Sequence, residues 1–205
     1  MLRVDSLASM YREIGMRLLE TGDVVYPRGM ETREIISPVI QIDNPRARLA
    51  FLPERKFNVV YALVESLMLF NKEDKLLYFS QFNENMKNFS DDGVHLYGAY
   101  GNRFANFIPN IINKLKEDKD SRQAILTIYN NDCNVKTKDI PCTLNLHFLI
   151  RDDKLNMIAY MRSNDIIWGT PYDIFMFTML QEVVANSLGI ELGWYRHIPS
   201  SLHVY

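Results

Sequence analysis

One cysteine has a setting that suggests chemistry. Cys142 directly follows Pro141 and precedes TLNLHFLIR (143–151), an alternating run that is typical of a β-strand. A free cysteine is most often a small buried residue, and this is one interpretation of Cys142. At the rim of a strand, a thiol can instead face a cleft, where a nearby positive charge favours the nucleophilic thiolate. Arg162, at the end of the next alternating run, is the candidate for that charge.

Two more arginines lie beside turn-forming or hydroxyl residues. Arg28 lies between a proline and a glycine in YPRGM, and Arg122 follows Ser121. The planar guanidinium group suits bidentate binding of a phosphate. A single arginine is nevertheless more often a solvated surface charge, and spacing alone does not show that Arg28, Arg122 and Arg162 converge.

Four other polar residues have both a structural and a chemical interpretation. Asp173 lies where a helix is expected to begin, so it can simply interact favourably with the helix dipole. Glu65 is a lone acid inside an apolar helical stretch. His203 and Tyr205 alternate in SLHVY and can be core residues of a strand with satisfied polar tips. Taken one at a time, each structural interpretation is the simpler one.

The elements that would position these residues change character along the chain. Apolar residues recur at helical spacing in four segments, at 4–21, 56–71, 104–115 and 171–189. Alternating or β-rich runs occupy 122–130, 143–151 and 154–162, and short strands are expected at 192–199 and 201–205. The segment 26–35 is a turn that runs into a strand, and a glycine-punctuated loop spans 89–102. RDDK (151–154) is the expected hairpin turn between two of these runs. The pattern predicts one α+β domain over 1–205, with a mostly antiparallel sheet covered by helices.

Composition excludes several classes of protein. The net charge is −2, which argues against direct DNA binding or generic attachment to a membrane surface. Two cysteines are too few for a disulfide framework, and no cysteine or histidine partners have the spacing of a metal site. No apolar run approaches the length of a membrane span. We therefore expect a soluble protein with reduced thiols in a cytoplasm, which for a phage-encoded protein is that of the host.

Several segments, taken together and in order, resemble the thymidylate synthase and pyrimidine-nucleotide hydroxymethylase family. They are PRGMETREI, VESLMLF, YGAYGNRF, DSRQ, PCTLNLHF, MRSND and SLHVY. The resemblance places Arg28 in the phosphate loop, Glu65 at the catalytic glutamate and Tyr100 at the family's tyrosine. It also matches Arg122 to an arginine that crosses to the other subunit, and Cys142 to the nucleophile.

The resemblance implies a reaction and a cofactor. The Cys142 thiolate would add to C6 of a pyrimidine ring, so that C5 attacks the one-carbon unit of 5,10-methylenetetrahydrofolate. Glu65 would organise water and proton transfers, with Tyr100 nearby. The implied substrate is a pyrimidine nucleoside monophosphate, bound in an active site that a homodimer shares.

The remaining residues are implied to bind that nucleotide. Arg28, Arg162, Ser163 and the partner subunit's Arg122 would hold the 5′-phosphate. His203 and Tyr205 would bind the 3′-hydroxyl. The motif MRSND also places Asn164 among the substrate-binding residues and Asp165 near the ring.

One departure from the family pattern bears on the substrate. Asp173 stands where the family's uracil-reading residue is an asparagine. A carboxyl group can accept from the amino group of cytosine, and when protonated it can also satisfy N3. The sequence therefore resembles most the deoxycytidylate hydroxymethylase branch, which predicts 5-hydroxymethylation of dCMP or CMP. Thymidylate synthase, a dUMP hydroxymethylase and a catalytically silent nucleotide-binding relative are the alternatives.

Other departures concern the phosphate and folate sites. Gln123 replaces a second arginine, Met86 and Phe89 lie where tryptophans flank the folate, and His147 replaces a glutamine. The chain also stops at SLHVY, whereas family members continue. We therefore expect that the C-terminal part of the family is missing from this sequence.

Overall fold

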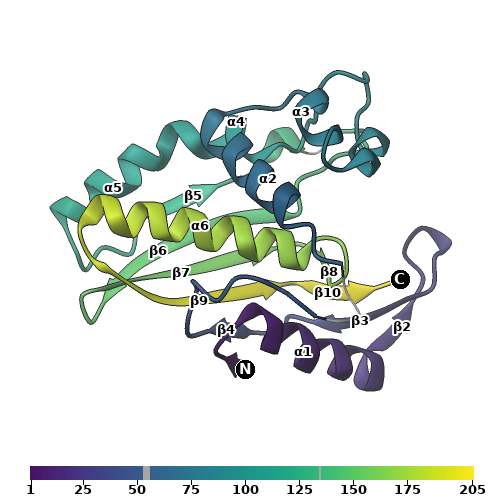
Figure 1. Ribbon diagram of the computed structural model, residues 1–205, viewed down its shortest axis with the longest axis horizontal. Helices are drawn as coiled ribbons and strands as arrows, with labels where there is room; N and C mark the ends of the chain where they lie inside the picture. Colours follow the sequence, from purple (N-terminus) through teal and green to yellow (C-terminus); the bar gives the residue numbers. More distant parts are fainter. Residues whose placement is uncertain (53–55, 134) are drawn as a thin grey trace.

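The computed structural model describes residues 1–52, 56–133 and 135–205 (Figure 1). The helices of these residues are α1 (Leu7–Thr21), α2 (Val59–Asn71), α3 (Leu76–Ser80), α4 (Tyr100–Phe104), α5 (Ile108–Glu117) and α6 (Thr170–Leu188). The first strands are β1 (Leu2–Val4), β2 (Asp23–Val25), β3 (Thr32–Ile36), β4 (Ile40–Ile42) and β5 (Ile125–Thr127). The later strands are β6 (Thr143–Arg151), β7 (Lys154–Met161), β8 (Asn164–Asp165), β9 (Glu191–Pro199) and β10 (Ser201–Val204).

The strands form two mixed sheets rather than one. The larger has the order β1-β4-β9-β7-β6-β5 and the smaller has the order β2-β3-β10-β8. Among the described residues, five of the eight strand pairs are antiparallel, and three pairs (β1 with β4, β7 with β9, β8 with β10) are parallel. The expected α+β fold is confirmed. The smaller sheet forms because the chain leaves β9 at Ser200 and continues there as β10.

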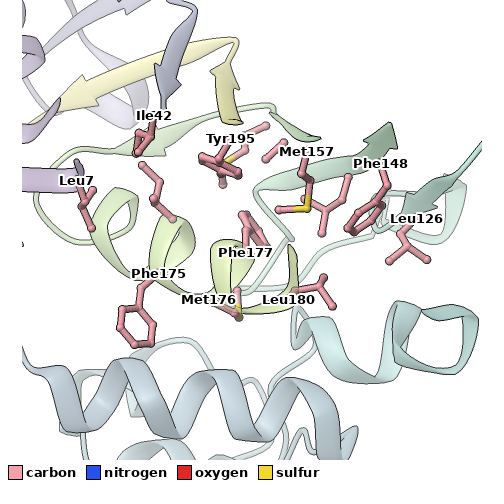
Figure 2. Close-up of a cluster of buried hydrophobic side chains, with 14 of the residues drawn as sticks. Leu7, Ile42, Leu126, Phe148, Met157, Phe175, Met176, Phe177, Leu180 and Tyr195 are labelled. Atoms are coloured by element: carbon pink, nitrogen blue, oxygen red, sulfur yellow. The ribbon is translucent and has the colours of Figure 1, made fainter. Parts of the chain in front are cut away.

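Helix α6 forms the centre of the fold. It lies against the larger sheet, where it contacts β7 and β9, and α2 packs beside it (Figure 1). Pro171 lies in its first turn, and Gly189, with a left-handed φ of 70°, ends it. The aromatic and aliphatic side chains between α6 and the sheet, among them Phe177, Tyr195 and Phe148, are fully buried (Figure 2). Because α6 is buried along most of its length, residues in its first turn are held firmly in place.

Strands β6 and β7 form the hairpin that the sequence predicts. Arg151 pairs with Lys154, and the two intervening aspartates have left-handed φ values of 53° and 54°. Such a two-residue turn matches the twist of the flanking strands. At the other end of the hairpin, the Arg162 amide donates to the Cys142 carbonyl over 2.8 Å. The register of the hairpin therefore places these two residues side by side.

Several element boundaries differ from the prediction. The first helix begins at Leu7 instead of Val4, because Val4 belongs to strand β1 and Ser6 caps α1 by accepting from the Ser9 amide. Strand β5 covers only three residues of the expected run 122–130, and the expected loop 89–102 ends in α4. Strand β4 and helix α3 have no counterpart in the prediction. In the part of the chain that the structure describes, no helix is long and apolar enough to span a membrane.

Candidate active site

Four side chains from separate elements line one cavity of about 150 Å³. They are Glu65 from α2, Tyr100 from α4, Cys142 from the segment before β6, and Asp173 from the first turn of α6. These are the four residues for which the sequence predicts a catalytic role. The fold therefore brings together groups that are separated by more than a hundred positions in the chain.

Cys142 is contacted by Arg162 and Ser163. Arg162 Nη2 lies 3.5 Å from the Cys142 sulfur, and the Ser163 hydroxyl lies 3.9 Å from it. The same guanidinium group donates to the carbonyl oxygens of Ile140 and Pro141, at 2.9 Å each. Arg162 consequently holds the segment that carries the thiol and places a positive charge beside it.

Burial nevertheless has the largest effect on this thiol. It raises the pKa of Cys142, Arg162 opposes the shift, and the nearby Asp173 adds to it, so that the net direction is upward. The sequence predicts that Arg162 favours the thiolate, and its charge acts in that direction. Desolvation of the buried thiol exceeds that effect, and the sequence alone gives no sign of it.

The environment of Glu65 favours its protonated form. Burial, followed by the charge of Asp173, raises the pKa of Glu65 to about 8, and a hydrogen bond from the Tyr61 hydroxyl at 3.2 Å opposes the shift. A carboxyl group with a pKa near neutrality can both release and take up a proton under physiological conditions.

Tyr100 is held at its phenol and along its ring. The Thr143 hydroxyl donates to the Tyr100 oxygen over 2.9 Å, and the ring stacks on Phe177 with centroids 5.8 Å apart. Burial raises the pKa of Tyr100 well above its ordinary value, so the phenol keeps its proton. Thr143 directly follows Cys142, and therefore one short segment positions both the thiol and the phenol.

Asp173 has one polar partner among the described side chains, which is Asn164. The amide nitrogen of Asn164 donates to Asp173 Oδ2 over 2.8 Å. Burial raises the pKa of Asp173 to about 7, and the hydrogen bond from Asn164 opposes this shift. Near pH 7 this carboxyl group is therefore balanced between its neutral and ionised forms.

The residues expected to bind the sugar form a second group at the C-terminal end of β10. The Tyr205 hydroxyl accepts from Arg28 Nη2 at 3.2 Å, and the ring of Tyr205 meets that of His203 edge to face, with centroids 5.1 Å apart. His203 is buried, and among the described residues its Nδ1 has no hydrogen-bond partner. A ligand hydroxyl is the kind of group that would satisfy that nitrogen.

None of the eight predicted substrate-binding residues is among those that line the cavity, and two of them make contacts away from Cys142. The Asp165 carboxyl group accepts from the amides of Ile167 and Trp168, so it stabilises the turn that leads into α6. Arg122 lies in a separate depression with Lys114, Ser121 and Gln123. Within one chain, Arg122 is therefore not brought to Cys142.

Sequence reasoning missed three polar residues behind Asp173. Thr170 and His197 form hydrogen bonds to Asn164, and Tyr195 forms one to His197. The alternation of the run 192–199 puts Tyr195 and His197 on one face of a strand, and this was a usable signal for two polar groups on the buried side. Among the described residues, no group of three or more potential metal ligands was found.

Comparison with known proteins agrees with this geometry. The thymidylate synthase family model matches residues 9–205, and the chain therefore belongs to the thymidylate synthase family. The deoxyuridylate hydroxymethyltransferase of Bacillus phage SP01 is 38% identical over 96% of this chain and 56% of that protein. The protein of the same description from Pseudomonas phage M6 is 37% identical over 79% of this chain and 49% of its own length.

A third relative is an archaeal protein of similar length. The putative thymidylate synthase of Methanocaldococcus jannaschii is 29% identical over 100% of this chain and 90% of that protein. By contrast, the chain spans about half the length of the phage relatives that it matches.

Proposed function

We propose that this chain carries the catalytic site of an enzyme that hydroxymethylates C5 of dUMP. The observation that carries the proposal is the contact of the Cys142 sulfur with Arg162 and Ser163, in a cavity shared with Glu65, Tyr100 and Asp173. A thiol in this setting can add to C6 of a pyrimidine, which makes C5 a nucleophilic carbon. Glu65, with its pKa of about 8, is suited to exchange protons with water and with the ring.

The choice of uracil rests on two observations. The phage relatives at 38% and 37% identity are described as deoxyuridylate hydroxymethyltransferases. In addition, the neutral form of Asp173 resembles an amide, since it offers one hydrogen-bond donor for O4 of uracil and one acceptor for N3–H. The comparisons thus favour the uracil alternative over the cytosine nucleotide that the sequence alone suggested.

Hydroxymethylation of dCMP is the second candidate, and Asp173 is the observation in its favour. A carboxyl group can accept from the cytosine amino group and, when protonated, can donate to N3. The pKa of about 7 leaves both forms available. A silent nucleotide-binding relative is the least favoured alternative, because such a protein has no need for a thiol in the cavity.

The remaining residues are assigned to the nucleotide by their positions. We assign the 3′-hydroxyl to His203, whose Nδ1 lacks a partner among the described residues, and to Tyr205. We assign the phosphate to Arg28, Arg162 and Ser163. Arg122 lies outside the cavity of its own chain, and we therefore propose a homodimer in which the partner subunit's Arg122 completes the phosphate site.

The cavity also has a wall that suits a folate. Phe79, Met86 and Leu96 form an apolar side of it, against which a flat pterin ring would pack. When bound, methylenetetrahydrofolate supplies the one-carbon unit. The residues of this chain would orient the ring, exclude bulk water and hold the protons at Glu65 and Tyr100.

The test uses the full-length protein with methylenetetrahydrofolate. Release of tritium from C5-labelled dUMP, dCMP and CMP is followed in parallel, and the products are identified by mass. We expect release from dUMP with a hydroxymethyl product, loss of release in Cys142→Ser, and retention in Cys133→Ala, which removes the other thiol. Release from dCMP alone would favour the second candidate, a methyl product would indicate a thymidylate synthase, and no release would favour the binding relative.

A further inference from the structure

A continuous chain of hydrogen bonds lies behind the Asp173 carboxyl group. The Tyr195 hydroxyl lies 2.8 Å from His197 Nδ1, and His197 Nε2 lies 2.8 Å from Asn164 Oδ1. The Asn164 amide nitrogen is 2.8 Å from Asp173 Oδ2. Tyr195, His197 and Asn164 are buried, whereas Asp173 lines the cavity that contains Cys142. The chain therefore connects the core of the larger sheet to the wall of the cavity.

The orientation of the Asn164 amide follows from its distances. The Thr170 hydroxyl lies 2.6 Å from Asn164 Oδ1. This separation is usual for O–H···O bonds, at about 2.5–3.0 Å, but short for N–H···O bonds, at about 2.7–3.2 Å. The atom that faces Thr170 and His197 is therefore the amide oxygen. The single hydrogen of the Thr170 hydroxyl is shared between that oxygen and the Asp165 carbonyl oxygen, which lies 2.9 Å away. With the amide oxygen facing Thr170 and His197, the Asn164 N–H group points towards Asp173.

The hydrogens of His197 agree with this orientation. Burial lowers the pKa of His197 to about 3, so the imidazole is neutral at pH 7 and carries one ring hydrogen. An amide oxygen can only accept, which places that hydrogen on Nε2. Nδ1 then accepts from the Tyr195 hydroxyl. Each donor in the chain consequently points towards Asp173.

The direction of these hydrogen bonds matters because a carboxyl group recognises a base through the positions of its donor and its acceptor. Uracil presents an N3–H donor and an O4 acceptor, while cytosine presents an N3 acceptor and an N4 amino donor. A neutral carboxyl group can match either edge, but the two edges require its hydrogen on opposite oxygens. The N–H group of Asn164 favours Oδ2 as an acceptor, and the hydrogen is then left to Oδ1.

We propose that Asn164 is a positioning residue that sets the choice between uracil and cytosine by keeping Asp173 Oδ2 as an acceptor. The proposal rests on the proposed function, because it assumes that Asp173 reads the base. Close packing supports it: a Cβ atom at Gly169 would lie 2.9 Å from Asn164 Nδ2 and 3.3 Å from Asp173 Oδ2. The pair is thus enclosed on that side, and neither group can turn away easily.

The sharpest variant is Asn164→Asp. It keeps the size of the side chain and an oxygen for His197 and Thr170, but replaces the N–H group that faces Asp173 by a second oxygen. We expect the ratio of the Kd values for dCMP and dUMP, measured by calorimetry on the full-length protein, to move at least tenfold towards unity. A ratio within twofold of wild type in folded Asn164→Asp would overturn the proposal.

Two more variants complete the test. Thr178→Val removes a buried hydroxyl of α6 that bonds only to carbonyls of its own helix, and it should leave the ratio unchanged. If Asn164→Asp does not fold, Tyr195→Phe removes the first donor of the chain instead. We expect at least a threefold change of the ratio in that variant, and an unchanged ratio would overturn the positioning role.

Measuring both nucleotide binding and turnover distinguishes the role of Asn164 from the proposed function. In one outcome, the wild-type protein discriminates between dUMP and dCMP in binding, Asn164→Asp loses this discrimination, and the wild-type protein releases no tritium. That outcome would contradict the catalytic function alone. Tritium release from dUMP together with unchanged discrimination in Asn164→Asp would contradict the role of Asn164 alone.

Discussion

Arg162 Nη2 lies 3.5 Å from the Cys142 sulfur and also donates to the Ile140 carbonyl. One nitrogen thus contributes both to the electrostatics of the thiol and to the position of the segment that carries it. Removing the arginine changes both properties, and they can be measured separately.

Replacing Arg162 should make the thiol harder to ionise. In Arg162→Gln the positive charge that lowers the pKa of Cys142 is lost while burial continues to raise it, so the pKa rises further. The pH dependence of Cys142 alkylation by iodoacetamide, followed by mass spectrometry, measures this shift. Arg3→Gln, which removes an arginine from an exposed ion pair with Asp43, is the control and should leave the profile unchanged. An unaltered profile in Arg162→Gln would contradict the assignment.

Replacing Asp173 should have the opposite effect on the same thiol. The charge of Asp173 raises the pKa values of both Cys142 and Glu65, and Asp173→Asn removes that charge. We expect Cys142 to be alkylated at lower pH and the Glu65 carboxyl resonance to titrate at lower pH in NMR spectra. Unchanged pKa values of Cys142 and Glu65 would show that the charge of Asp173 does not act on either group.

The buried acids should make stability depend on pH. Folding raises the pKa of Glu65 from 4.5 to about 8, so the folded protein binds more protons than the unfolded chain between these values. Stability from this group is therefore fully present below pH 4.5 and is lost as the pH rises through about 8. Asp173, raised from 3.8 to about 7, acts in the same direction.

The variant Glu65→Gln isolates this contribution. It should reduce the fall in the free energy of unfolding between pH 6 and pH 9 by about 1–3 kcal/mol, as measured by urea denaturation. Glu84→Gln, at an exposed ion pair with Lys87, should have no such effect. A fall equal to that of the wild type in Glu65→Gln would show that Glu65 is ionised in the folded protein.

The hydrogen bond between Thr143 and Tyr100 should matter for turnover. Thr143→Val removes the hydroxyl that donates to the phenol over 2.9 Å, at a cost of about 1 kcal/mol in stability. We expect kcat for tritium release to fall about tenfold, because the phenol loses its orientation, while the KM for the nucleotide changes less. If Tyr100→Phe already has a low rate, adding Thr143→Val should have little further effect. Additive losses in the double variant would argue against a shared role.

Gly169 should not tolerate a side chain. A Cβ atom there would lie 2.9 Å from Asn164 Nδ2, and overpacking of this kind costs about 1–3 kcal/mol. We expect Gly169→Ala to lower the Tm and to weaken nucleotide binding. Gly15→Ala is the matched control, because nothing lies within 4 Å of its added Cβ atom in α1, and it should stabilise the helix by about 0.5–1 kcal/mol. Equal Tm values for both variants would contradict the packing argument.

Local patterns in the sequence predicted much of the fold. The apolar stripe of α1, the hairpin turn at 151–154, and the proline and glycine at the two ends of α6 each depend on neighbouring residues, so they can be read without the tertiary structure. The short strands β4 and β8, of three and two residues, have no period of their own to detect. They exist because adjacent strands supply their hydrogen bonds.

Residue types and motifs were enough to name the groups that could do chemistry, and the family resemblance gave each of them an expected role. How those groups act depends on the folded structure. It showed that burial outweighs Arg162 at the thiol of Cys142. It also joined His197 to Asn164 across 33 positions, and separated Arg122 from the cavity of its own chain. Desolvation and long-range hydrogen bonding depend on which surfaces become enclosed, and this is a property of the packed molecule rather than of any segment.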